Sequence, residues 1–331
     1  MKIIFILTLC GFLAPAVWGG EKESYARVWP AAPDEPRIGF VRSISGPADV
    51  GIRPSAWSRF ASAITGAAKN AAALEKPFGV AVDDAGNLCV TDTGTGALCY
   101  FDLRHKKFRQ WKRAGTIDFK SPVAVAKRKS DLYVADSQLG EVVAFDEGGR
   151  LLFVVSNHLE RPVGVALAED RLFVVDSQLH KVVVFNLQGE FLSEFGQRGV
   201  GVGEFNFPTH IAATPRGEIL VTDSMNSRVE LFDHAGHWQG TIGEPGDSSG
   251  HFSRPKGVAM DSSGDVYVLD ALFDNLQIFS RAGDFLLDIG RTGTAPGEFW
   301  LPAGIAITSD NHIFVADSYN HRVQEFKFLG P

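Results

Sequence analysis

Apolar and polar residues alternate in short runs along most of the chain, and residues 302–326 show this pattern most clearly. Residues 302–307 read PAGIAI, residues 313–316 read IFVA, and residues 322–326 read RVQEF after a polar turn. Short runs rich in Val, Ile and Phe between turn residues are typical of β-strands. The stretch therefore predicts consecutive short strands joined by tight turns.

Five imperfect copies of this unit precede it in the chain. Each copy begins at a proline and has an aspartate after its second apolar run. The prolines are Pro77, Pro122, Pro162, Pro208, Pro255 and Pro302, and the aspartates Asp92, Asp136, Asp176, Asp223, Asp270 and Asp317 are 44, 40, 47, 47 and 47 residues apart. Such a period is typical of four-stranded propeller blades. We therefore predict an all-β fold, a six-bladed β-propeller of four-stranded blades over residues 37–331.

Alanine recurs at one place in the first strand of every repeat. The first strands of a propeller converge on its axis and leave room only for small side chains, so the recurrence indicates packing and not chemistry. The six positions are Ala81, Ala126, Ala166, Ala212, Ala259 and Ala306.

The two ends of the chain predict how the ring closes. After Phe326 only residues 327–331 remain, too few for an outer strand and its turn. Residues 40–46 (FVRSISG) resemble the outer strands at 191–196 and 285–290. We expect a strand at 37–44 to complete the last blade, because an unpaired edge would leave backbone groups exposed.

The repeated pattern resembles the NHL repeat. Residues 320–322 (NHR) are close to the triplet that names this repeat, and residues 226–228 (NSR) have the form Asn-x-Arg. The resemblance covers residues 77–326 and implies NHL-type blades. It does not select a function, since the family includes protein-binding, RNA-binding, sensor and lyase members.

The beginning of the chain predicts export. Residues 1–20 combine a lysine, an apolar run and a final Gly-Gly, as a secretory signal does, and a Pro- and Glu-rich leader follows at 21–36. We expect a periplasmic or extracellular protein, with a membrane tether only if Cys10 is lipidated. Leu9 stands where a lipoprotein signal has a small residue. No later stretch reaches the length of about 18 to 20 apolar residues that spans a bilayer, so no transmembrane span is expected after signal removal.

Residues 55–74 depart from the strand pattern. Trp57, Phe60, Ile64 and Ala68 recur at helical spacing, so we predict one N-terminal amphipathic helix. Its apolar stripe packs on its own domain or contacts a partner or membrane surface. The whole chain has 32 Lys and Arg against 39 Asp and Glu, a net charge of -7. Nucleic acid is therefore not an expected partner, because affinity for its phosphates depends on clustered cations.

Cys89 and Cys99 fall on neighbouring strands of one predicted hairpin. In an oxidising compartment they form a disulfide if they lie opposite each other. Otherwise they are two reduced thiols in the core. Both interpretations fit the sequence.

One face of the predicted ring, which we call face A, carries the turns between second and third strands. The links from each fourth strand to the next first strand and the predicted helix lie on the same face. The turn tips on face A are apolar, and exposed apolar patches mark interaction sites; alternatively, the helix and long links bury them. The tips are Leu139, Leu179, Met225, Leu272, Phe273 and Tyr319.

One histidine stands at a first-strand entrance to the channel. This residue is His210, and we expect it to be a hydrogen-bonded wall or a ligand contact. His180 and His321, at turn tips, reach the mouth only if those turns lean inward. A metal site needs three or four converging ligands, so we predict no metal and no cofactor. The positions that match His210 are Gly79, Ala124, Gly164, Gly257 and Gly304.

The resemblance to NHL repeats also implies that Asp223 pairs with Arg228 and Asp317 with Arg322 to brace their turns. Lys181 partly keeps this charge in blade three, while Ala97, Glu141 and Asn275 break the pattern in blades one, two and five. We expect the remaining aspartates to be held by backbone amides, because an unpaired buried carboxylate is costly.

The leading hypothesis is an exported, non-enzymatic binding or scaffold propeller that recognises a protein, peptide or glycan on face A. The alternative is a metal-assisted lyase or hydrolase at the channel mouth around His210, a class suggested by resemblance to peptidyl-hydroxyglycine amidating and streptogramin lyases. That alternative requires at least three polar ligands within about 2 to 2.6 Å of one point. A third hypothesis is a structural subunit that docks through the helix.

Overall fold

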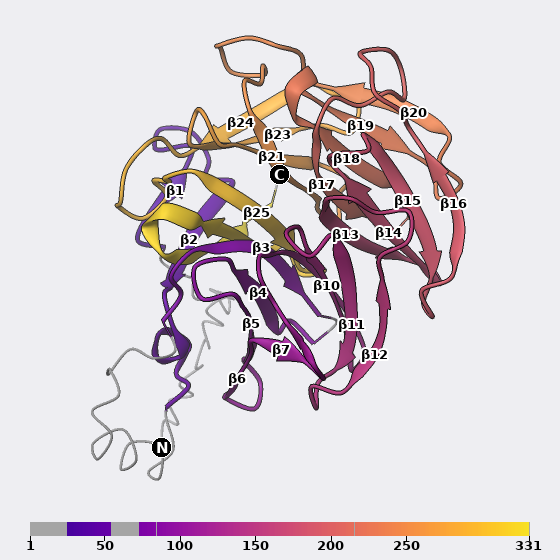
Figure 1. Ribbon diagram of the computed structural model, residues 1–331. Helices are drawn as coiled ribbons and strands as arrows, with labels where there is room; N and C mark the ends of the chain where they lie inside the picture. The colour runs from indigo at the N-terminus through magenta and orange to yellow at the C-terminus, as the bar shows by residue number, and fades with distance from the viewer. Residues whose placement is uncertain (1–24, 54–72, 84, 215, 331) are drawn as a thin grey trace, which may run out of the picture.

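The computed structural model describes residues 25–53, 73–83, 85–214 and 216–330 (Figure 1). The predicted signal peptide lies outside these residues, and so does the predicted helix except for Ala73 and Leu74, which are not helical. The helices within the described ranges are three short 3-10 turns: η1 (Pro47–Val50), η2 (Ser224–Asn226) and η3 (Ser318–Asn320). No helix in those ranges has the length and apolar character to cross a bilayer.

Six antiparallel sheets form the blades of a propeller around a central channel (Figure 1). Blade one contains β3 (Pro77–Val82), β4 (Leu88–Asp92), β5 (Ala97–Asp102) and β6 (Lys107–Trp111). Blade two contains β9 (Pro122–Arg128), β10 (Asp131–Asp136), β11 (Glu141–Asp146) and β12 (Leu151–Val155). Blade three contains β13 (Pro162–Ala168), β14 (Arg171–Asp176), β15 (Lys181–Asn186) and β16 (Phe191–Phe195).

Blade four contains β17 (Pro208–Ala213), β18 (Ile219–Asp223), β19 (Arg228–Phe232) and β20 (Trp238–Ile242). Blade five contains β21 (Pro255–Met260), β22 (Val266–Asp270), β23 (Asn275–Phe279) and β24 (Phe285–Ile289). Every first strand begins at the proline that starts its repeat. The prediction of an all-β, six-bladed propeller is therefore confirmed.

Blade six joins the two ends of the chain. It contains β25 (Pro302–Ile307), β26 (His312–Asp317) and β27 (Arg322–Phe328), and its outer strand is β2 (Ile38–Ile44). β2 runs antiparallel to β27, with Ile44 opposite Val323 and Ile38 opposite Phe328. In Figure 1 the indigo strand β2 lies beside the yellow strands of the C-terminus. The predicted closing strand is confirmed.

A fifth strand extends blade six beyond the expected four. β1 (Val28–Trp29) pairs with β2 at the outer edge, in the stretch predicted to be a leader. The reason is aromatic packing: the Trp29 ring lies edge-on to Phe326, with 5.8 Å between ring centroids. Arg27 also donates a hydrogen bond to the Pro296 carbonyl oxygen at 2.7 Å. These contacts cover the edge that β2 would otherwise expose.

A charged cluster ties the closing strand to its neighbour. Glu325 on β27 accepts from Arg42 Nε at 2.5 Å, and its other oxygen lies 2.8 Å from His312 Nδ1. Burial alone would raise the pKa of Glu325, but His312 and the charge of Arg42 outweigh it and hold that pKa below its ordinary value. The cluster therefore stabilises the ring when Glu325 is ionised.

The core is divided into six clusters, and each fills the space between two neighbouring blades. One cluster contains Ile44, Val80 and Phe314, so blade six packs on blade one and the ring is continuous. The cluster between blades five and six contains the fully buried Ile38 and Phe326. The closing strand thus contributes to both cores beside the last blade.

The links on face A are ordered loops. In three of them a short parallel bridge closes the loop, from Arg198 to Phe205, from Pro245 to Phe252 and from Thr292 to Phe299. These three phenylalanines are fully buried and anchor the loops to the blades. The link after blade one instead forms a small hairpin, β7 (Arg113–Ala114) and β8 (Ile117–Asp118).

Cys89 and Cys99 are free, buried thiols, so the disulfide interpretation is not borne out. In the register of β4 and β5, Cys89 pairs with Tyr100 and Cys99 pairs with Val90. Adjacent residues of a strand point to opposite faces. Cys89 accordingly packs between blades one and two, and Cys99 between blades six and one.

Candidate binding face and channel mouth

The first strands of the six blades line the central channel. A cavity of about 220 Å³ occupies it, and all six recurrent alanines line this cavity. A second cavity of about 130 Å³ lies at the first-strand entrances, on face A, and we call it the channel mouth. His210 lines both cavities and so separates the mouth from the channel.

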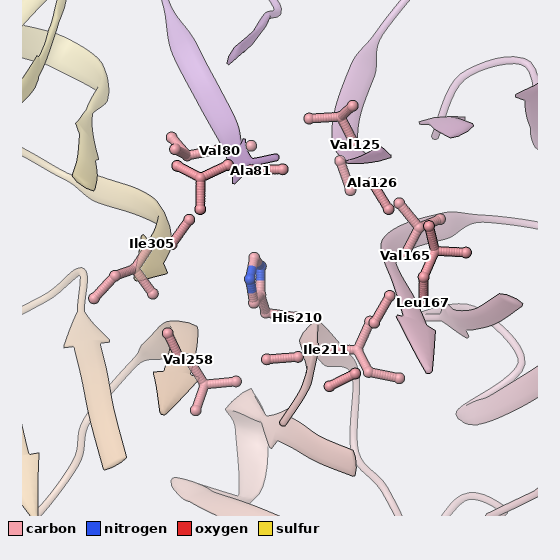
Figure 2. A pocket seen from close by; sticks show the side chains of 18 of the residues that line it. Val80, Ala81, Val125, Ala126, Val165, Leu167, His210, Ile211, Val258 and Ile305 are labelled. Atoms are coloured by element: carbon pink, nitrogen blue, oxygen red, sulfur yellow. The ribbon is translucent and has the colours of Figure 1, made fainter. Parts of the chain in front are cut away.

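The His210 ring projects into the centre of the channel, among apolar side chains such as Val80, Val165 and Ile305 (Figure 2). Glycine occupies the matching position of blade one, and no side chain fits there, because a Cβ on Gly79 would lie 2.5 Å from the Val123 carbonyl oxygen. No described residue forms a hydrogen bond with the ring. His210 is therefore not the hydrogen-bonded wall residue that was one expectation, and its geometry favours the other expected role, contact with a ligand.

Burial lowers the pKa of His210 to about 4, and the charge of Lys256 adds to this effect. The ring is therefore neutral near pH 7. A neutral imidazole has one donor and one acceptor nitrogen, so it can contact either an anionic or a neutral polar group.

Three cations gather at the channel mouth. Lys256 and Arg161 line the cavity, and Arg254 lies close enough to act on Lys256. Burial, followed by the charges of Arg254 and Arg161, lowers the pKa of Lys256. None of the three side chains forms an ion pair or hydrogen bond with any residue in the described ranges.

Sequence reasoning missed this group because Arg161 and Arg254 are far apart in the chain and meet only when the ring forms. A signal was present in the aligned repeats. Both arginines directly precede a first-strand proline, and Lys256 directly follows one. A comparison of the residues on either side of each proline would have identified them.

Half of the predicted turn tips are well exposed on face A. Leu272 is 62 % exposed, Met225 52 % and Tyr319 42 %. Leu139, Leu179 and Phe273 are half-buried.

The links add exposed apolar side chains that the sequence reasoning did not select. Trp300 lies beside Tyr319, with 5.7 Å between ring centroids, and the Lys76 ammonium lies 4.8 Å from the Tyr319 ring centroid. The other exposed large apolar residues on the links within the described ranges are Val200, Val202, Phe207 and Leu301.

Phe207 and Leu301 are held in a conformation that bulky residues rarely adopt. Their φ angles are 50° and 49°, in the left-handed region. His180 Nδ1 accepts from the Phe207 N–H at 3.1 Å, and Asp274 accepts from the Leu301 N–H at 2.7 Å. Such backbone strain persists only where surrounding contacts enforce it, and it concentrates at functional sites.

The two predicted turn-bracing pairs are present. Arg228 Nε lies 3.0 Å from Asp223 Oδ2, and Arg322 Nε lies 2.8 Å from Asp317 Oδ2. Each arginine also donates to two carbonyl oxygens of the preceding link; those of Arg322 belong to Ala295 and Glu298. The pairs therefore fix the loops that present the apolar side chains of face A.

The other marker aspartates are held by backbone amides, as expected. Asp92, for example, accepts from the N–H groups of Glu75 at 2.7 Å and Lys76 at 3.0 Å. Lys181 does not take the place of the arginine in blade three: its Nζ lies 2.7 Å from Glu194 on the outer strand. A lysine lacks the planar fork with which arginine reaches an aspartate and two carbonyl groups together.

The two remaining histidines of the turn tips have structural contacts. His180 is buried and packs edge-on against Phe207, with 4.5 Å between ring centroids, while His321 Nδ1 contacts the Glu75 carbonyl oxygen. Neither lines the mouth cavity. Within the described ranges, no three or more His, Cys, Asp or Glu side chains are grouped so that they could hold a metal ion.

Comparisons with known families agree with this architecture. Residues 252–279 and 299–326 match the NHL repeat, and residues 155–216 match a family described as a 6-bladed beta-propeller. The chain is thus a six-bladed propeller with NHL repeats. None of the curated proteins compared matches the sequence.

Several solved structures share the fold. A streptogramin B lyase gives a TM-score of 0.58 at 10 % identity, covering 77 % of this chain and 94 % of that chain. A protein of unknown function from Bacteroides thetaiotaomicron gives 0.62 at 13 % identity, covering 88 % and 75 %. Hydrazine synthase from Kuenenia stuttgartiensis gives 0.57 at 12 % identity, covering 80 % and 98 %. Identities this low show a common fold alone.

Proposed function

We propose that this six-bladed NHL-repeat propeller is an exported, non-enzymatic binding protein that recognises a protein, peptide or glycan partner on face A. One observation carries the proposal: eight of the fifteen exposed large apolar side chains among the described residues lie on the links and turns of face A. Burial of such side chains against a partner is favourable by about 1.5 to 3 kcal/mol for each large residue.

The rigidity of face A supports the same proposal. The Asp–Arg pairs hold the links, and buried phenylalanines anchor them. Exposed residues that are already fixed lose little conformational entropy on binding, so more of the contact energy becomes affinity.

The lyase or hydrolase alternative draws on the fold shared with the streptogramin B lyase. It requires at least three converging ligands at the mouth, and the described residues supply only His210 as a His, Cys, Asp or Glu lining group. Binding is therefore the function that the geometry supports better.

Site-specific photo-crosslinking in the native cells tests the proposal. A photoreactive phenylalanine analogue at Tyr319 on face A is compared with the same analogue at Phe285 on the outer strand β24, which is similarly exposed. We expect a crosslinked partner from Tyr319 and none from Phe285. Equal capture at both positions, or capture from Phe285 alone, would contradict the proposal.

A further inference from the structure

The channel mouth is cationic although the chain as a whole carries a net charge of -7. Arg161 comes from blade three, His210 from blade four and Lys256 from blade five, so three consecutive blades contribute to one wall of the cavity. A half-buried lysine beside two arginines is unfavourable unless an opposite charge compensates it.

The two marker aspartates that contact the backbone beside these cations are already engaged. Asp176 accepts from the N–H groups of Glu160 at 2.7 Å and Arg161 at 2.8 Å. Asp270 accepts from the Arg254 N–H at 3.0 Å and from a neighbouring amide. Both aspartates are fully buried. They stabilise the backbone at the entrance and leave the side-chain cations uncompensated.

Hydroxyl groups line the mouth next to the cations. Ser177 and Thr209 belong to blades three and four. The Thr209 hydroxyl is buried and has no hydrogen-bond partner, and no described residue accepts from or donates to the Ser177 hydroxyl. The Ser177 hydroxyl thus faces the mouth beside the free cations with its hydrogen-bonding capacity unused, as at a site for a polar ligand.

We propose that the channel mouth binds a small oxyanion, a carboxylate or phosphate group of the face A ligand, between Lys256 and Arg161. The Ser177 hydroxyl donates to the same oxyanion. The proposal rests on the proposed function and specifies the chemistry of its ligand. A volume of about 130 Å³ suits one carboxylate or phosphate group and is too small for a longer segment of a peptide or glycan. Charge-assisted hydrogen bonds to lysine and arginine are the strong ones in proteins.

The direct test uses His210 as the reporter. The full chain, with labelled histidine, is titrated with inorganic phosphate or acetate, with chloride at matched ionic strength as the reference. We expect a saturable shift of the His210 signals with at least one oxyanion, together with a rise of its pKa, because the anion offsets the charge of Lys256. No saturable shift with either oxyanion would overturn the proposal. The two titrations distinguish a phosphate site from a carboxylate site.

Paired variants assign the effect to the mouth. Lys256→Met is expected to weaken oxyanion binding at least about tenfold. Lys112→Met removes the same charge from an exposed position outside the mouth and is expected to bind like the wild type. Arg161→Gln, at an exposed position, provides a second variant should Lys256→Met fail to fold. Unchanged binding in the folded mouth variants would overturn the proposal.

The crosslinked partner separates the two proposals. If the partner binds face A and Lys256→Met weakens that binding, both the proposed function and the oxyanion site are supported. If it binds face A with equal affinity for Lys256→Met, the oxyanion site fails and the proposed function stands. If oxyanions bind the mouth but no partner crosslinks to face A, the proposed function fails and the site stands as a site for free oxyanions.

Discussion

Substitution of Ile38 by alanine tests whether the N-terminal strand locks the ring. Ile38 is fully buried and packs with Phe299 and Phe326 between blades five and six. It reaches this core only through β2, which comes from the opposite end of the chain. The substitution leaves the backbone pairing intact and removes apolar volume from the closed blade.

The expected loss of stability in Ile38→Ala follows from the burial of the Ile38 side chain. Truncating a fully buried isoleucine to alanine costs about 2 to 5 kcal/mol. For a propeller of this length the unfolding entropy is roughly 0.6 kcal/mol per degree, so the Tm falls by about 3 to 8 °C. Leu192→Ala, on the outer strand β16 where the side chain is exposed, is the control and shifts the Tm by about 1 °C or less.

Calorimetry gives the Tm, and amide hydrogen exchange locates the weakened region. In Ile38→Ala we expect β26 and β27 to exchange faster than β14, because blade six opens first. A Tm equal to that of the control, or equal protection of blades three and six, would refute closure by β2.

Three further predictions concern buried charges and thiols. Because its pKa is lowered on folding, Glu325 stabilises the protein above about pH 4.5, and this effect is lost as the pH falls through the folded-state pKa. The urea midpoint of Glu325→Gln should therefore fall less steeply than that of the wild type as the pH is lowered. Arg322→Leu leaves a buried aspartate without its counter-ion and should cost about 3 to 5 kcal/mol by urea unfolding, whereas Arg291→Leu, which removes a side chain that is 74 % exposed, should shift the urea midpoint far less. Burial raises the pKa of Cys89 and raises that of Cys99 to about 12, so neither thiol should be alkylated before denaturation, and a peptide that links the two by mass spectrometry would contradict the structure.

The fold could be predicted from the sequence because its information is local and repeated. Each first-strand proline and each second-strand aspartate marks the same place in a blade, and Pro302 and Asp317 occupy the same structural positions as Pro77 and Asp92. Ring closure could be predicted because the last repeat lacks an outer strand. The extra strand at Val28–Trp29 was missed because two residues give no periodicity, and it forms through Trp29 packing on a distant ring.

The candidate site was only partly predictable. His210 could be singled out because it replaces glycine or alanine at a repeated position. The exposed Leu272 and the half-buried Phe273 could not be distinguished, because neighbouring residues in one turn differ only in the contacts made by the folded links. The cations at the mouth were missed because no short-range motif unites Arg161 with Lys256. Their proximity is a property of the closed ring.

The affinity of face A for its partner tests the central claim most directly. Leu272→Asp places a charge on the most exposed turn tip, and Leu286→Asp places the same charge on the exposed outer strand β24. With the partner captured through Tyr319, isothermal titration calorimetry should show at least about tenfold weaker binding for Leu272→Asp and wild-type binding for Leu286→Asp. Wild-type affinity in Leu272→Asp, or equal losses in both variants, would contradict binding on face A.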